Sequence, residues 1–243
     1  MSRTRTALRS ALARSRMSRL AERLDAVRAA LCDAAIACAR PPEAVRLLAV
    51  SKTQPASALA EAWACGQRMF GENYLQEALA KQSALADLPI EWHFIGAIQS
   101  NKTAAIARAF DWVHTIDRLR IAERLDAQRG DELPPLNVLI EVNVSGESTK
   151  HGVTPAALPT LIPAIAALPR LRLRGLMTLP APTSNVAEQR AAFRVLADLA
   201  RASTLPFDTL SMGTSDDYRA AIAEGATLVR LGTAVFGPRR EAA

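Results

Sequence analysis

The sequence contains only three cysteines and no long apolar run. Cys32, Cys38 and Cys65 are odd in number, and their spacing is not that of metal ligands. They are best interpreted as small apolar side chains of a protein in a reducing compartment, so we expect a cytoplasmic location. No apolar run reaches the roughly 18 residues that a membrane-spanning helix needs. We therefore expect a soluble protein with no membrane partner.

Several motifs that would assign a chemistry are also missing. There is no Gly-x-x-x-x-Gly-Lys-Ser/Thr run, which argues against nucleotide hydrolysis, and no Gly-x-Ser-x-Gly nucleophile elbow. The three histidines, His93, His114 and His151, share no ligand spacing, so we predict no metal site. His93 lies in an apolar run and is either a pocket wall or a satisfied core residue, whereas His114 looks structural.

Positive charge is concentrated at one end of the sequence. The net charge is +6, but residues 1–16 contain five arginines and no acidic residue, which leaves +1 on the other 227 residues. We therefore expect no nucleic-acid-binding face. The basic segment is either a transit peptide or an extension before a native start at Met17, and we favour the extension. We expect residues 1–16 to be disordered and 17–243 to form the folded domain.

From residue 46 onward, strand-like and helical patterns alternate. An amphipathic helix at 18–39 comes first and ends before Pro41 and Pro42. The predicted strands are 46–51, 68–71, 91–95, 111–115, 136–144, 171–177, 209–212 and 227–231. The predicted helices between and after them are 56–65, 73–86, 101–109, 118–129, 155–167, 185–203 and 216–224. This pattern predicts an α/β fold, a single (β/α)₈ TIM barrel with an extra N-terminal helix, in preference to a doubly wound open sheet.

Lys52 follows the first predicted strand, where the active groups of such barrels gather. Partial burial lowers the pKa of a lysine, and a neutral amine can attack a carbonyl to form a Schiff base. The alternative is a lysine that extends to the rim of the strand.

Two turns of small residues follow the last two strands. They are 213–216 (Gly-Thr-Ser-Asp) and 232–237 (Gly-Thr-Ala-Val-Phe-Gly), at the usual phosphate site of these barrels. Each turn alone could be only a turn. Arg230 lies within an apolar strand, so its guanidinium either pairs with Glu72 or Asp216 or faces a ligand. Together with Lys52, these features favour a phosphorylated aldehyde, and pyridoxal 5′-phosphate (PLP) is the obvious one.

The sequence resembles the pyridoxal phosphate homeostasis proteins of the YggS/PROSC family from about residue 20 to 238. The resemblance rests on the segments 48–53 (Leu-Ala-Val-Ser-Lys-Thr), 70–77 (Phe-Gly-Glu-Asn-Tyr-Leu-Gln-Glu), 92–96 (Trp-His-Phe-Ile-Gly), 99–102 (Gln-Ser-Asn-Lys), 174–177 (Arg-Gly-Leu-Met), 210–213 (Leu-Ser-Met-Gly), 215–217 (Ser-Asp-Asp) and 229–237 (Val-Arg-Leu-Gly-Thr-Ala-Val-Phe-Gly). It implies a barrel like the N-terminal domain of alanine racemase.

The resemblance also implies the roles of individual residues. Lys52 would form an aldimine with PLP, and Arg230 would face the pyridine nitrogen. The phosphate would be held by Ser215, Gly232 and Thr233, with Ser211 and Gly213 nearby. The ring would be lined by Asn73, His93, Asn143 and Met177. Two positions depart from the family pattern: Thr214 replaces a common methionine, and Gln54 replaces a frequent lysine.

The resemblance implies a PLP carrier in vitamin B6 homeostasis rather than an enzyme. A racemase needs a second base, and neither Tyr74 nor Tyr218 is assigned that role; a guanidinium such as that of Arg230 also cannot accept a proton. A PLP-dependent amino acid racemase remains the alternative, ahead of a Schiff-base aldolase of sugar phosphates. We expect a monomer that delivers PLP to apo-enzymes.

Overall fold

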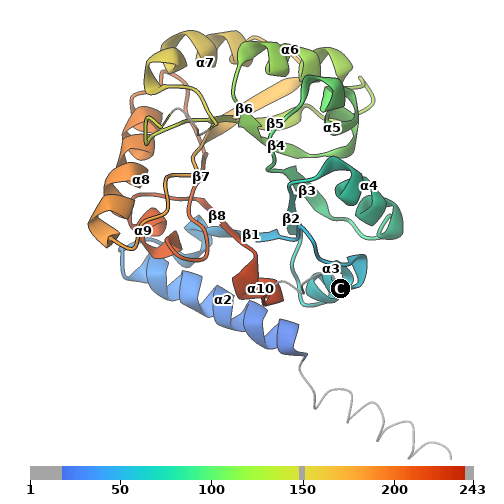
Figure 1. The fold of residues 1–243 in the computed structure, drawn as a ribbon, viewed down its shortest axis with the longest axis vertical. Coiled ribbons are helices and arrows are strands. Elements are labelled where there is room, and N and C mark those ends of the chain that lie inside the picture. Colours follow the sequence, from blue (N-terminus) through green and yellow to red (C-terminus); the bar gives the residue numbers. More distant parts are fainter. Residues whose placement is uncertain (1–17, 148–150, 239–243) are drawn as a thin grey trace, which may run out of the picture.

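A computed structural model describes residues 18–147 and 151–238, and the predicted barrel is confirmed. Eight parallel strands close in sequence order from β1 to β8 (Figure 1). β8 pairs with β1 through the partners Leu48 and Arg230, which closes the ring. The strands are β1 (Arg46–Val50), β2 (Met69–Glu72), β3 (Glu91–Phe94), β4 (Trp112–Ile116), β5 (Leu136–Glu141), β6 (Leu171–Met177), β7 (Thr209–Ser211) and β8 (Leu228–Leu231).

Helices follow the strands and surround the barrel. They are α3 (Ala56–Ala64), α4 (Leu75–Ala84), α5 (Thr103–Ala109), α6 (Leu119–Gln128), α7 (Leu158–Ala166), α8 (Val186–Arg201), α9 (Tyr218–Ala223) and α10 (Thr233–Phe236). Three short 3₁₀ helices, η1 (Pro42–Ala44), η2 (Ser100–Lys102) and η3 (Pro155–Ala157), also occur in the described residues. No helix in the described part of the sequence is long and apolar enough to cross a membrane.

The predicted N-terminal helix is α2 (Arg19–Ile36). It starts where the hydroxyl of Ser18 accepts a hydrogen bond from the amide of Ala21 (3.1 Å), a normal N-cap. Its apolar face packs on α3, α9 and α10, so it covers the side of the barrel where the ring closes (Figure 1). The predicted disordered extension, residues 1–16, lies outside the described residues.

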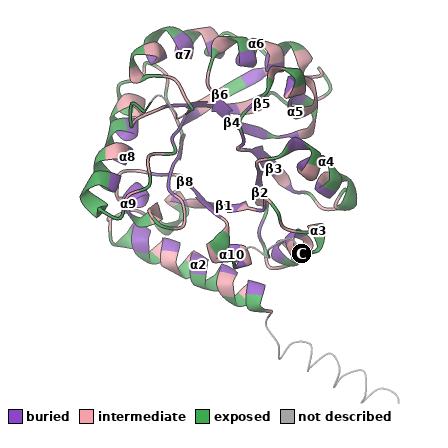
Figure 2. Cartoon of the chain, viewed as in Figure 1, coloured by how far each residue is buried: buried purple, intermediate pink, exposed green. Residues whose placement is uncertain are grey.

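Most of the apolar core lies between the strands and the helices. The strands are the most buried part of the molecule (Figure 2). Phe70, Phe110 and Phe193 are among the large side chains with essentially no exposure. Burial of one such side chain contributes roughly 1.5–3 kcal/mol to stability.

The barrel interior is smaller and partly polar. Trp112, Leu139 and Met177 form a separate apolar cluster on adjacent strands. The ring of His93 stacks on Trp112 with 5.3 Å between ring centres, which fills the middle of the barrel. The space at the carboxyl ends of the strands therefore has a packed floor beneath it.

Candidate functional site

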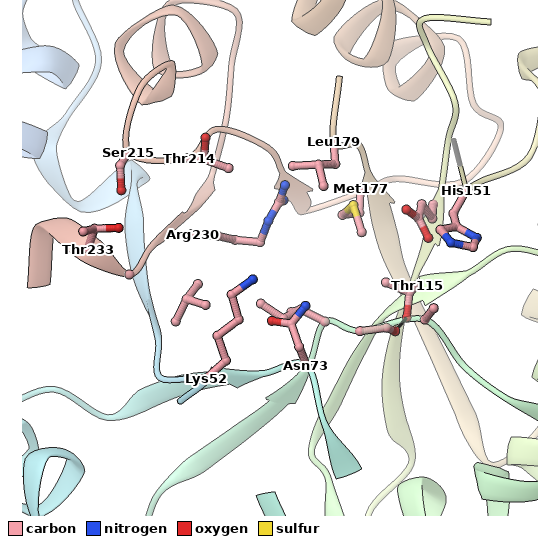
Figure 3. A pocket seen from close by; sticks show the side chains of 16 residues that line it. Lys52, Asn73, Thr115, His151, Met177, Leu179, Thr214, Ser215, Arg230 and Thr233 are labelled. Carbon is pink, nitrogen blue, oxygen red and sulfur yellow. Dashed lines mark hydrogen bonds between the residues drawn. The ribbon is translucent and has the colours of Figure 1, made fainter. Parts of the chain in front are cut away.

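A pocket of about 320 Å³ opens at the carboxyl ends of the strands, within the size range of small-ligand sites. Seven of the residues predicted for the cofactor site line it: Lys52, Asn73, Met177, Ser215, Arg230, Gly232 and Thr233. They come from five different strand ends, so barrel closure brings them together. In Figure 3, Lys52 and Asn73 lie below the space, Ser215 and Thr233 lie to its left, and Arg230 lies above Lys52.

Lys52 lies two residues beyond β1, and the backbone bends sharply after it. Thr53 has φ of +66°. A β-branched residue rarely adopts this left-handed conformation, which costs roughly 1–2 kcal/mol. The surrounding structure must therefore stabilise the bend, and it does so through a buried ionic cluster.

That cluster consists of Lys81, Glu72 and Glu77. Lys81 is almost fully buried, and its Nζ lies 2.7 Å from Glu72 Oε1 and 2.6 Å from Glu77 Oε1. The same ammonium donates to the main-chain oxygen of Ser51 (2.7 Å), and Glu77 accepts from the amide of Thr53 (2.5 Å). The two residues beside Lys52 are thus both held by this cluster.

Glu72 lies at the bottom of the same cluster. Burial raises its pKa, although hydrogen bonds from Lys81 and the hydroxyl of Ser51 (2.6 Å) oppose that effect. Its second oxygen, Oε2, is buried and has no hydrogen-bond partner. The carboxylate is therefore committed to the lysine and the serine and does not reach the pocket lining.

The two small-residue turns form one side of the pocket. Gly213 has φ of +93°, a conformation that favours glycine, and the turn after it is closed by Asp217, which accepts from the amide (2.5 Å) and hydroxyl (2.9 Å) of Thr214. Gly232 approaches β1 so closely that a Cβ there would lie 3.1 Å from the oxygen of Val50. Together with the hydroxyls of Ser215 and Thr233, these turns have the composition of a phosphate cradle.

Arg230 reaches the pocket from β8 and is almost fully buried. Its guanidinium donates to the oxygen of Thr178 (2.9 Å) and to both the main-chain oxygen (2.6 Å) and the hydroxyl (2.8 Å) of Ser211. The predicted alternative, an ion pair with Glu72 or Asp216, is not among the ion pairs of the described residues. Burial lowers the pKa of Arg230 to about 10, so it remains charged at neutral pH.

Four predicted residues do not line the pocket. His93 is fully buried beneath it, with its ring nitrogens on Glu91 and His114. Ser211 lies under the guanidinium of Arg230, and Gly213 lies behind the phosphate-side turn.

Asn143, also predicted to line the ring, shapes the loop after β5 instead. Its amide donates to the oxygen of Glu147 (2.8 Å), and its Oδ1 accepts from the amide of Gly146 (3.0 Å). None of the four residues lines the pocket, and their predicted roles at the ring and the phosphate stay predictions.

Sequence reasoning missed one charged lining residue, Glu141 at the end of β5. It is 8% exposed, and burial raises its pKa, while the nearby His151 and Arg230 act in the opposite direction. Thr115, His151 and Leu179 complete this side of the pocket (Figure 3). A signal did exist, because Glu141 is the one charged residue of β5, whose other residues are apolar except for Asn137.

The fold and the pocket first define a class. The sequence profile of the alanine racemase N-terminal domain matches residues 23–240, so the protein is a barrel of that class. The pyridoxal phosphate homeostasis protein of Pseudomonas aeruginosa is 60% identical over 223 residues, 92% of this chain and 97% of the relative. That of Escherichia coli K12 is 53% identical over 229 residues, covering 92% and 98%.

A solved structure agrees. PipY of Synechococcus elongatus, described as having PLP bound, superposes with a TM-score of 0.77 at 39% identity and covers 90% of this chain and 100% of its own. The chain belongs to the family of pyridoxal phosphate homeostasis proteins, which confirms the resemblance found in the sequence.

Proposed function

We propose that this protein binds PLP reversibly in the pocket at the carboxyl ends of the strands and serves in vitamin B6 homeostasis. The observation that carries the proposal is the common location of Lys52, Ser215, Thr233 and Arg230 in one pocket. The bound PLP described for the homologous PipY supports the choice of ligand.

The residues present fit such a ligand. The Oδ1 atom of Asn73 is buried at the pocket and has no hydrogen-bond partner, so a ligand can supply one. The missing side chain of Gly232 lets this turn lie close against β1, where a Cβ would be 3.1 Å from the oxygen of Val50. When bound, PLP supplies an electrophilic aldehyde.

Each group would then have its own task. Nζ of Lys52 would bond to the aldehyde carbon with loss of water. The hydroxyls of Ser215 and Thr233 and the adjacent amides would hold the phosphate. Met177 would provide an apolar surface for the ring, and the positive charge of Arg230 would lie near the ring nitrogen. Because a guanidinium is a donor only, it favours an unprotonated nitrogen.

That environment favours storage over catalysis. An unprotonated ring nitrogen is a weak electron sink. Tyr74 is 57% exposed at the start of α4, and Tyr218 begins α9 next to the phosphate-side turn, so neither lies in the pocket lining. We propose a carrier that limits free PLP and releases it to apo-enzymes as a monomer in the cytoplasm.

The test uses purified protein incubated with PLP. We expect a yellow chromophore, and borohydride reduction followed by peptide mapping should place the label on Lys52. Lys52→Ala should lose both the chromophore and the label. Labelling of another lysine would overturn the assignment, and deuterium uptake from solvent into alanine would favour the racemase instead.

A further inference from the structure

A line of hydrogen bonds crosses the barrel interior from the pocket to the opposite end. It consists of Arg230, Ser211, His114, His93 and Glu91, and we call it the interior relay. The successive distances are 2.8 Å from Arg230 Nη1 to Ser211 Oγ, 2.9 Å from Ser211 Oγ to His114 Nδ1, 2.9 Å from His114 Nε2 to His93 Nδ1, and 2.8 Å from His93 Nε2 to Glu91 Oε1.

The relay runs through the barrel interior from one end to the other. Glu91 is the first residue of β3 and its side chain is 40% exposed, so it lies at the end of the barrel opposite the pocket. Ser211, His93 and His114 are fully buried. Since β4 and β7 are not neighbours, the contact between His114 and Ser211 spans the barrel interior.

The proton positions follow from the ends of the relay. The carboxylate of Glu91 can only accept, so a neutral His93 carries its proton on Nε2 and donates to it. Nδ1 of His93 is then an acceptor, so a neutral His114 carries its proton on Nε2 and donates to it. Nδ1 of His114 in turn accepts from the hydroxyl of Ser211, whose oxygen accepts from Arg230.

An added proton would break this arrangement. If His114 were doubly protonated, its Nδ1 would become a donor, and the hydroxyl of Ser211 would lose its acceptor. If His93 were doubly protonated, its Nδ1 would become a donor and would face the N–H of His114. A change of tautomer in His114 would remove that clash but would again take the acceptor from Ser211. An unsatisfied buried hydroxyl costs about 1–3 kcal/mol. Burial also lowers the pKa of both histidines.

The charged groups around the rings do not change this conclusion. Arg46 and Arg230 lower the pKa of His114 further. Glu91 and Asp111 raise the pKa of His93, but burial lowers that pKa more strongly. The hydrogen bond from His93 lowers the pKa of Glu91, which keeps its carboxylate charged.

We propose that the interior relay positions Arg230. Within residues 18–147 and 151–238, the guanidinium donates to no carboxylate, and the relay connects it to the carboxylate of Glu91 through Ser211 and two neutral histidines of the same tautomer. Glu91, about three side chains away from the pocket, is then a positioning residue for the ligand site. Only this last statement rests on the proposed function. The tautomers and the hydrogen bonds of the relay are expected in the protein without ligand as well.

The first experiment is ¹⁵N NMR of histidine-labelled protein without ligand. From about pH 5.5 to about pH 8, His93 and His114 should both remain neutral with the proton on Nε2. The exposed His151 provides the reference for a ring outside the barrel. A proton on Nδ1 of either buried ring, or a doubly protonated ring, would overturn the relay.

The second experiment measures binding of pyridoxine 5′-phosphate, which has the ring and the phosphate but no aldehyde. Glu91→Gln keeps an acceptor for His93 and removes the charge, so affinity should fall about fivefold, the lower end of the usual coupling between separate sites. Glu123→Gln on the exposed face of α6 is the matched control and should bind as the wild type does.

The two experiments separate the possible failures. Unchanged affinity in Glu91→Gln would overturn the positioning role even if the tautomers are as expected. Absence of any binding to the wild type, together with the expected tautomers, would contradict the proposed function and leave the relay intact.

Discussion

The ammonium of Lys81 lies 2.7 Å from the main-chain oxygen of Ser51, the residue immediately before Lys52. A buried lysine on α4 therefore holds the backbone of the lysine that we assign to the cofactor. Glu77 does the same on the other side through the amide of Thr53. The reactive residue is positioned by residues that do not line the pocket.

Lys81→Met should destabilise the protein by about 3 kcal/mol, because it leaves the buried carboxylate of Glu72 without its counter-ion. Urea denaturation measures this change. Lys102→Met, at the end of η2, is the matched control and should change stability by less than about 0.5 kcal/mol. Equal stability of the two variants would contradict the role of the cluster.

Ser51→Ala tests the other contact of Glu72. The hydroxyl donates to Glu72 Oε1 at 2.6 Å, and hydrogen bonds to charged groups contribute about 1.5–3 kcal/mol. We expect a loss of about 2 kcal/mol in the free energy of unfolding. Ser57→Ala on the exposed side of α3 should have little effect, and a similar loss there would refute the explanation.

Gly213→Ala should distort the phosphate-side turn. A Cβ at this position would lie 2.7 Å from Cβ of Ala221, in addition to the strain of its φ of +93°. Together these effects should cost roughly 3 kcal/mol and weaken PLP binding.

Gly225→Ala separates strain from collision. Gly225 also has positive φ, +102°, but the nearest atom to an added Cβ is 4.0 Å away, on Leu210. Its cost should be about 1 kcal/mol, with PLP binding unchanged. Equal effects of the two glycine variants would show that the collision in the turn is unimportant.

Glu141→Gln should stabilise the protein at neutral pH and not at acidic pH. Burial raises the folded-state pKa of Glu141 above its unfolded value, so the wild-type protein loses stability as pH rises through that folded pKa. The variant has no such loss. Melting temperatures of the two proteins should agree below the unfolded pKa of the carboxyl group and diverge above it. A constant difference at all pH values would contradict the effect of burial.

Much of the fold was predictable because the pattern is repetitive. Apolar runs such as 46–51 and 171–177 coincide closely with β1 and β6, and the prediction of β5 is too long only beyond Glu141. The N-terminal helix was predictable from its apolar spacing and from the prolines after it. Local patterns of this kind depend on neighbouring residues alone.

The site was predictable in part for the same reason. Lys52 and the turn at 232–237 follow strands directly, so their place at the pocket follows from the class of fold. The contact of Lys81 with Ser51 left no local signal, because it depends on where α4 packs. The charge of Glu141 in an apolar strand was a signal, but its place in the pocket lining depends on which way β5 faces.

The amino-acid sequence alone determined that this protein is a parallel barrel with a lysine after its first strand and two small-residue turns after its last strands. Only the tertiary structure decided which polar side chains meet inside it. His93 and His114 lie on β3 and β4, and they meet Ser211 and Arg230 of β7 and β8 only because the ring closes. Such contacts depend on the register and tilt of strands far apart in sequence, and no local pattern encodes these.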